Sequence, residues 1–153
     1  MGSGVPSATN NDALAARHFS VEIDGTSVAQ FTEISGISSE IEVIELKENT
    51  LDGKPVIKKL PGNKKPPTIT LKRAKNVSMD LYNWHKDMLD GKVMKARKNA
   101  SIVLYDYEMG EVARWNMINA WVSKVGTSNL SAKANEVATE EVSIVMEDFV
   151  RIK

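Results

Sequence analysis

Cysteine is missing from the 153-residue sequence, and histidine is rare. Without cysteine, no disulfide can hold the fold and no thiol can act as a nucleophile or a metal ligand. The two histidines, His18 and His85, lie far apart in the chain and have no partner at metal-ligand spacing. No apolar run approaches the roughly 20 residues of a membrane-spanning helix. We therefore expect no metal site, no cofactor and no insertion into a membrane.

Catalytic motifs are also missing. None of the nine glycines belongs to a phosphate-binding loop, a dinucleotide-binding fingerprint or a nucleophile elbow. The carboxylate pairs Glu140–Glu141 and Glu147–Asp148 are adjacent residues, and adjacent residues point to opposite faces of a strand. Neither pair therefore converges on a substrate, and we expect the protein not to be an enzyme.

The net charge is zero, but the charges are unevenly distributed along the chain. Residues 1–46 carry a net charge of −6, residues 47–98 of +9 and residues 99–153 of −3. Two arrangements fit this pattern: the basic middle pairs with the acidic ends within one chain, or one basic and one acidic face bind copies head to tail. The basic stretch Lys54–Arg73 contains no aromatic residue on which a base could stack. We therefore expect no sequence-specific binding of nucleic acid.

Most of the sequence alternates between apolar and polar residues, which is typical of half-buried β-strands. Residues 1–16 are mostly small and polar and predict a flexible N-terminal arm, whereas residues 17–153 have the length and composition of one β domain. The N-terminus also lacks the basic and apolar regions of a secretory signal. The strand-like segments are 17–24, 27–37, 39–47, 68–71, 100–107, 112–125 and 136–152.

One segment has the period of a helix. Ser78 is a suitable N-cap, and Leu81, Trp84, Met88 and Leu89 form one apolar face behind it. Gly91 is a suitable terminator. We predict a single substantial helix over about residues 78–90, packed against an antiparallel β-sandwich or barrel.

Residues 48–67 show no clear period and contain several prolines and glycines, which predicts a long extended loop. Apolar residues are unexpected on an exposed loop, so we expect them to contact a neighbouring subunit together with the lysines beside them. These contact residues are Val56, Ile57, Lys58, Lys59, Leu60, Lys64 and Lys65.

Alternation along the strands separates a predicted core from a polar face. The predicted core residues are Leu71, Leu81, Trp84, Met88, Trp115, Met117, Val142, Ile144 and Met146. The polar side chains on the opposite face of the strands are Arg114, Asn116, Thr139, Glu141, Ser143 and Glu147.

Three motifs in this order resemble the tail tube proteins of contractile phage tails and extracellular contractile injection systems, which are related to the haemolysin-coregulated tube protein of type VI secretion. The resemblance covers about residues 17–150, and it departs from the family at Ala74, where glycine is expected, and at Val122, where proline is frequent. The motifs are Ile69–Arg73 leading into the helix with Leu81, Tyr82 and Trp84; Gly110–Asn116 followed by Asn119–Trp121; and Ala134–Val142.

The resemblance implies a structural subunit whose hexameric rings stack head to tail into a hollow tube, with the polar strand face lining the lumen. Its implied partners are further copies of itself, contractile sheath subunits, baseplate hub and terminator proteins, and a cargo of protein effector or DNA. It also implies assembly in the bacterial cytoplasm and a final place in a virion tail or an injection particle.

Two other functions remain open at this point. One is a monomeric β-barrel that binds a ligand, and the other is a baseplate or sheath-associated relative of the same fold. The sequence does not distinguish a phage tail from an injection system, nor does it identify the cargo.

Overall fold

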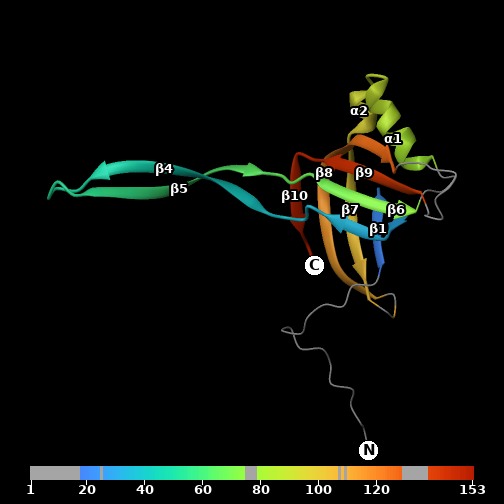
Figure 1. Cartoon of the computed structure of the whole chain (residues 1–153), viewed down its shortest axis with the longest axis horizontal. Helices are drawn as coiled ribbons and strands as arrows, with labels where there is room; N and C mark the ends of the chain where they lie inside the picture. The colour runs from blue at the N-terminus through green and yellow to red at the C-terminus, as the bar shows by residue number, and fades with distance from the viewer. Residues whose placement is uncertain (1–17, 25, 75–78, 107, 109, 129–137) are drawn as a thin grey trace, which may run out of the picture.

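A computed structural model describes residues 18–24, 26–74, 79–106, 108, 110–128 and 138–153. The predicted N-terminal arm and the predicted cap Ser78 lie outside these residues. The elements are β1 (His18–Ile23), β2 (Thr26–Phe31), β3 (Glu33–Ser35), β4 (Glu40–Asn49), β5 (Pro55–Lys65), β6 (Ile69–Ala74), α1 (Asp80–Leu89), α2 (Val93–Ala96), β7 (Lys98–Tyr105), β8 (Glu111–Thr127), β9 (Thr139–Val145) and β10 (Asp148–Arg151) (Figure 1).

The body of the molecule consists of two antiparallel sheets that share the 17-residue strand β8. The first sheet has the order β2-β1-β7-β8, and β10 lies on the other side of the first half of β8. The second sheet has the order β8-β9-β6-β3. β2 leads almost directly into β3, and the amide of Thr32 donates to the carbonyl of Lys72, so the two sheets also meet there. This arrangement confirms the predicted mainly β fold of the sandwich or barrel type.

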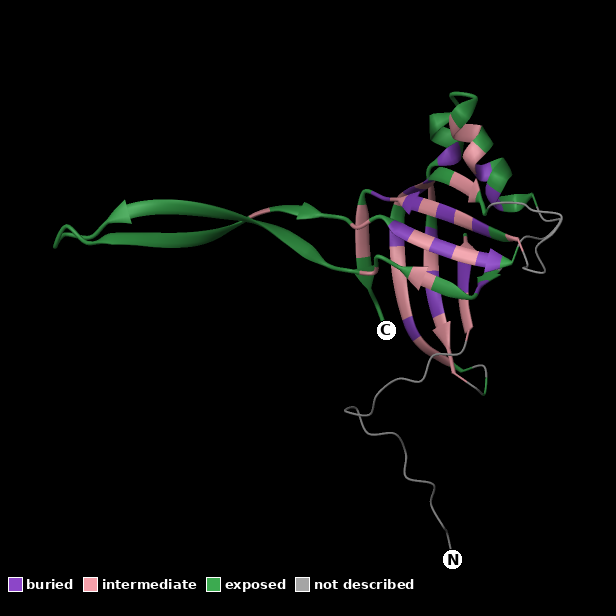
Figure 2. Cartoon of the chain, in the orientation of Figure 1, coloured by how far each residue is buried: buried purple, intermediate pink, exposed green. Residues whose placement is uncertain are grey.

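A single hydrophobic core lies between the two sheets (Figure 2). Ile102 and Met117 come from the first sheet, Leu71 and Ile144 from the second, and Leu81 adds an apolar side chain from the helix. All five are fully buried: alternation turns the four strand residues inward, and Leu81 lies on the apolar face of α1. Of the predicted core residues, the buried ones are Leu71, Leu81, Trp84, Met117, Val142, Ile144 and Met146.

Two predicted core residues, Met88 and Trp115, are only half-buried. Met88 lies in the last turn of α1, one turn beyond Trp84, where the helix leaves the core. Trp115 packs against the core cluster with one side, while the guanidinium of Arg151 lies 5.6 Å from its ring centroid. Both residues belong to the rim of the core rather than to its centre.

The predicted helix exists as α1, but a second short helix, α2, follows it and was not predicted. Gly91 ends α1 with a positive φ of 77°, and its amide donates to the carbonyl of Met88. The indole Nε1 of Trp84 donates to the carbonyl of Ala96, which fixes α2 against α1. α2 is too short to carry a detectable helical period.

Two predictions about the strands are wrong. Residues 48–67 do not form an extended loop, because most of them belong to the hairpin of β4 and β5, with a turn at residues 50–54. Residues 136–152 do not form one long strand either: the described part is divided into β9 and β10 at Met146–Glu147. There the chain leaves the second half of β8 and pairs with its first half.

Gly36 has a specific role where β3 leads toward the hairpin. Its φ is +88°, and a Cβ atom added to it would lie 2.2 Å from the carbonyl oxygen of Thr68. Gly91 has a similar φ of +77°, but nothing lies within 4 Å of its added Cβ. A side chain at Gly36 would therefore meet both backbone strain and a steric clash, whereas a side chain at Gly91 would meet backbone strain alone.

We predict that Gly36→Ala destabilises the protein by at least about 2 kcal/mol, because strain and clash add, whereas Gly91→Ala costs about 1 kcal/mol from strain alone. Chemical denaturation of both variants measures the two values. Equal losses would show that the approach to Thr68 is relieved at no cost.

Candidate assembly surfaces

The hairpin of β4 and β5 projects far from the two-sheet body (Figures 1 and 2). Every residue of both strands is exposed except the half-buried Gly62. A two-stranded hairpin without a covering layer is at best marginally stable in water. This hairpin nevertheless exposes eight aliphatic side chains, namely Ile41, Val43, Ile44, Leu46, Leu51, Val56, Ile57 and Leu60.

The strand register sorts these side chains onto two faces, because paired residues of antiparallel strands point to the same side. Ile44 pairs with Leu60, and Leu46 and Val56 follow on the same side, together with the ion-paired Lys58 and Glu48. We call the four aliphatic residues of this side the aliphatic face of the hairpin. On the other side, Val43 and Ile57 are interspersed with Glu45, Lys47 and Lys59. With four aliphatic side chains against two, the aliphatic face is the more apolar side of the hairpin and the better candidate for a contact with another molecule.

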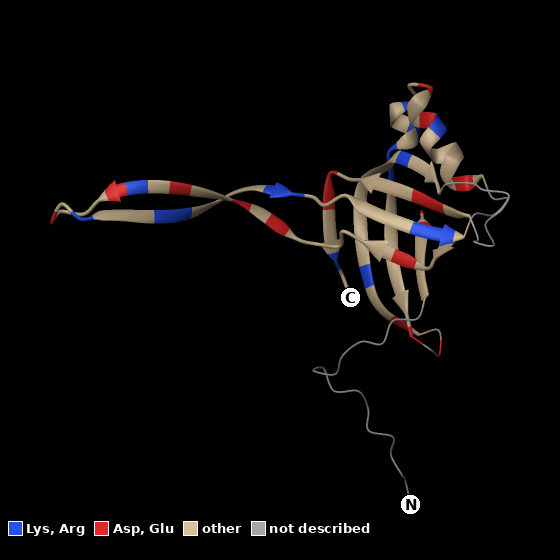
Figure 3. Cartoon of the chain, viewed as in Figure 1, with Lys and Arg blue, Asp and Glu red and all other residues tan. Residues whose placement is uncertain are grey.

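The hairpin lysines have acidic partners within their own chain (Figure 3). Lys58 Nζ lies 2.8 Å from Glu48 Oε2, and Lys65 Nζ lies 3.8 Å from Glu40 Oε1. Lys59 pairs in register with Glu45 across the hairpin. Lys64 lies 4.0 Å from Asp148 of β10. Of the two arrangements that the charge pattern allowed, pairing within one chain therefore holds for the hairpin.

The outward side of the first sheet carries a charged cluster around Arg114. Its Nη1 donates to Glu22 Oε2 at 2.8 Å, and its Nε donates to Glu111. These two hydrogen bonds, with Glu22 the stronger contributor, raise the pKa of Arg114 above its ordinary value, so the guanidinium stays charged. Nearby, Ser101 Oγ donates to Asn116 Oδ1 at 2.8 Å. Two carboxylates around one guanidinium leave this cluster with a net negative charge.

The six polar side chains predicted to line a lumen do not all lie on one face of the chain. Arg114 and Asn116 lie on the outward side of the first sheet. Thr139, Glu141 and Ser143 alternate with buried residues of β9 and point outward from the second sheet. Because both sheets bury their inward sides against the same core, their outward sides face away from each other. Alternation identifies the polar side of each strand but not which sheet the strand joins.

Glu147, the sixth residue of that set, lies at the corner between β9 and β10. Its Oε2 accepts a hydrogen bond of 2.7 Å from Asn119 Nδ2, and its Oε1 lies 3.8 Å from Arg97 Nη1. Its backbone amide donates to the carbonyl of Ile118. These contacts hold Glu147 at a corner of the fold, where its side chain is 56% exposed.

A buried ion pair was missed by the sequence analysis. Arg73 Nε lies 2.9 Å from Glu140 Oε2, both side chains are 6% exposed, and the Arg73 guanidinium lies 5.7 Å from the ring centroid of Phe31. The sequence contained a sign of this burial, because Arg73 lies at the same alternate positions of β6 as the buried Ile69 and Leu71. The pair joins β6 to β9 where they are registered, so its role is in the fold.

The described residues contain no cluster of three or more potential metal ligands. Among the helices described, none is long and apolar enough to cross a bilayer. The features that stand out are therefore surfaces for contact, namely the hairpin and the outward sides of the sheets.

Comparison with known proteins points to a tube. A family model described as the T4-like virus tail tube protein gp19 matches residues 15–150. No protein of curated function matches the sequence.

Several solved structures share the fold at low sequence identity. A chain of the anti-feeding prophage cap is 20% identical with a TM-score of 0.72, and the match covers 100% of this chain and 99% of that one. A chain of the PVC sheath-tube complex in its extended state is 18% identical with a TM-score of 0.71, over 94% and 93%. A chain of a gene transfer agent virion is 10% identical with a TM-score of 0.59, over 92% and 100%.

The position of the hairpin lysines gives a prediction that separates pairing within one chain from pairing between copies. Lys58→Glu places a negative charge beside Glu48 and should speed amide exchange in β4 and β5 up to about fivefold, the equivalent of an exposed ion pair worth up to about 1 kcal/mol. Adding Glu48→Lys to the same chain should restore the original rate. If the second change fails to restore it, the partner of Lys58 belongs to another copy.

Proposed function

From its membership in the T4-like virus tail tube protein family, which makes the chain a structural tube subunit, we propose how copies of it assemble. Six copies form a ring, and rings stack head to tail into a hollow tube. The observation that carries this proposal is the aliphatic face of the hairpin. None of the described residues covers it, although burying each large aliphatic side chain contributes about 1.5–3 kcal/mol. A neighbouring copy supplies the missing layer.

Two strand edges support closure of a ring. In the described part of the chain, β2 pairs only with β1 along Thr26–Gln30, and β10 pairs only with β8. Both strands lie at margins of the first sheet, so pairing β10 of one copy with β2 of the next continues this sheet from subunit to subunit. Such a contact joins two different surfaces, and it closes when the rotation between copies divides a full turn. The resemblance to tail tubes supports six as that number.

In the proposed ring, the outward side of the first sheet faces the channel. That side carries Glu22, Glu111, Arg114, Ser101 and Asn116, a set of partly exposed polar groups with a net negative charge. A polar lining offers no apolar patch to which a cargo would adhere. Repeated around a ring, the acidic excess also repels nucleic acid phosphates. Thr139, Glu141 and Ser143, on the other outward side, then face the outside of the tube or another copy.

The tube would lie inside a contractile sheath, contact a baseplate hub at one end and a terminator at the other, and conduct a cargo of protein effector or DNA. It would be assembled in the bacterial cytoplasm and end in a virion tail or an injection particle. The role of such a subunit is mechanical and requires neither catalysis nor a cofactor. No observation favours the alternative functions of a monomeric ligand-binding module or a baseplate or sheath-associated relative.

The aliphatic face leads to a prediction about assembly. The double variant Ile44→Ser/Leu60→Ser should fold but lower the affinity between copies at least a hundredfold, because two buried aliphatic side chains are lost per contact. The matched control is the double variant Val43→Ser/Ile57→Ser on the opposite face. It should assemble more readily than Ile44→Ser/Leu60→Ser. Sedimentation and electron microscopy of the purified chains measure assembly. Equal tube formation by both double variants would contradict the assignment of the face.

The lumen assignment leads to a second prediction. In assembled tubes, Asn116→Cys should react with a small thiol reagent that enters the channel and should resist a bulky one that does not. Ser143→Cys, from the outward side of the second sheet, is the matched control and should show no such dependence on reagent size. Labelling of Asn116→Cys by both reagents, at equal rates in tubes and free subunits, would place the first sheet outside the channel.

A further inference from the structure

The tip of the hairpin carries an apolar side chain in a position that is usually polar. Leu51, in the turn between β4 and β5, is 108% exposed relative to an extended reference, the highest exposure among the exposed large hydrophobic residues. The turn itself is well hydrogen-bonded: the amide of Thr50 donates to the carbonyl of Lys54, the amide of Gly53 donates to the carbonyl of Thr50, and Thr50 Oγ1 accepts from the amide of Lys54. Gly53 supplies the required positive φ of 75°. The turn thus presents Leu51 on a well-defined support.

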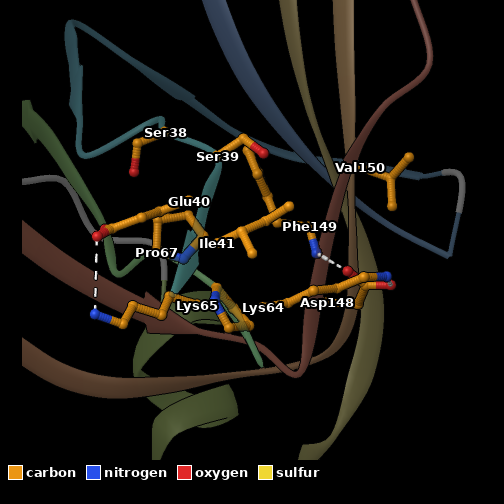
Figure 4. A pocket seen from close by; sticks show the side chains of 11 residues that line it. Ser38, Ser39, Glu40, Ile41, Lys64, Lys65, Pro67, Asp148, Phe149 and Val150 are labelled. Atoms are coloured by element: carbon orange, nitrogen blue, oxygen red, sulfur yellow. Dashed lines mark hydrogen bonds and ion pairs between the residues drawn. The ribbon is translucent and has the colours of Figure 1, made fainter. Parts of the chain in front are cut away.

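The base of the same hairpin carries a cavity of about 210 Å³ (Figure 4). Its apolar wall includes Ile41, Phe149 and Val150, and two consecutive prolines, Pro66 and Pro67, complete it. Ile41 is 55% exposed and Val150 is 41% exposed, so this apolar wall is accessible to a side chain of another molecule. An apolar cavity of about 150 Å³ is enough to bind benzene, which has more carbon atoms than a leucine side chain, so this cavity has room for one leucine.

The charges at the two ends of the hairpin are complementary. At the tip, Asp52 and Lys54 follow Leu51 in the turn. At the cavity, Lys64 and Lys65 stand beside Asp148 and Glu40, and these two ion pairs are long, at 4.0 and 3.8 Å. The two lysines are 76% and 54% exposed, so they are free to turn toward an incoming carboxylate. Asp52 then meets a lysine of the rim, while Lys54 meets Glu40 or Asp148.

We propose that the Leu51 side chain at the hairpin tip of one copy inserts into the cavity at the hairpin base of a second copy, in the ring stacked next to it. The inference rests on the proposed tube and adds the pair of surfaces that sets how rings follow one another. Asp52 and Lys54 orient the tip at the rim, and burial of Leu51 against Ile41, Phe149 and Val150 supplies the affinity.

The length of the hairpin makes this contact intermolecular. β4 has ten residues, so tip and base of one chain are separated by about 30 Å at 3.4 Å per residue. The contact joins two different surfaces of the chain. Each copy is shifted along the hairpin relative to the one before it, so successive contacts do not lead back to the first copy. The contact therefore repeats without limit, as the growth of a tube requires. The hairpin then acts as a spacer that relates each copy to the next.

The absence of cysteine from the chain permits a direct test by crosslinking. A disulfide requires Cα atoms within about 7 Å, so the double variant Leu51→Cys/Val150→Cys cannot close on itself and should link neighbouring copies in assembled tubes under mild oxidation. We expect a ladder of dimers, trimers and longer chains in a non-reducing gel, because each copy offers one tip and one base. Each single variant should stop at dimers or remain uncrosslinked. The matched control Leu51→Cys/Met94→Cys moves the second cysteine to α2, where Met94 is 88% exposed, and should give no ladder.

A second pair of variants tests the contact without crosslinking. Leu51→Asp should raise the protein concentration needed for tube formation at least tenfold, whereas Leu51→Met, which preserves the apolar volume, should change it less than twofold. Tubes that form without the ladder, or a Leu51→Asp variant that assembles like the original chain, overturn this inference and leave the proposed function intact. Failure of the unaltered chain to form tubes at any concentration would refute both.

Discussion

The structure depends on β8 keeping one side toward the core while it passes from the first sheet to the second. A regular strand of 17 residues cannot do so, because the sheets have different directions and strict alternation would turn the wrong side chains inward. β8 carries an extra residue near Asn119, whose φ is +51°, and another near Ser123. The inward residues change accordingly from Ala113 and Met117 to Ala120 and Val122. Each bulge bends the strand and resets the alternation.

The surroundings of these bulges explain why several polar residues are where they are. The amide of Asn119 donates to Asn99 Oδ1, and its side chain donates to Glu147, which ties the first bulge to β7 and to the corner before β10. His85 Nδ1 lies 2.8 Å from the carbonyl oxygen of Val122, which ties the helix to the strand just before the second bulge. Glu147, which was predicted to line a channel, thus shares with Asn99, Asn119 and His85 a contact to the irregular part of β8.

The extent to which the sequence predicted this structure follows from burial. Strands with one buried side, such as β7, β8 and β9, show a clear period of two, and α1 shows a clear helical face. The hairpin buries neither side, so β5 has no period, and Pro55, Pro61 and Gly62 argued against a strand. The available signals were Asp52-Gly53 as a turn and the opposition of glutamates in β4 to lysines in β5. The polar set was divided between two sheets because alternation is a property of one strand and carries no information about sheet order.

The hairpin combines strong apolar exposure with protection against wrong pairing. An exposed strand edge is a template for aggregation, and proteins protect such edges with lysine and proline. β5 contains both: Pro55 and Pro61 have no N–H group to donate, and Lys58, Lys59, Lys64 and Lys65 are strongly hydrated. The paired glutamates of β4 neutralise most of these charges, so copies do not repel one another when hairpins approach. Edge-to-edge addition is thereby disfavoured, while the aliphatic face and Leu51 remain available. The proposed assembly therefore uses the face and the tip of the hairpin, and it leaves β2 and β10 as the edges for pairing within the proposed ring.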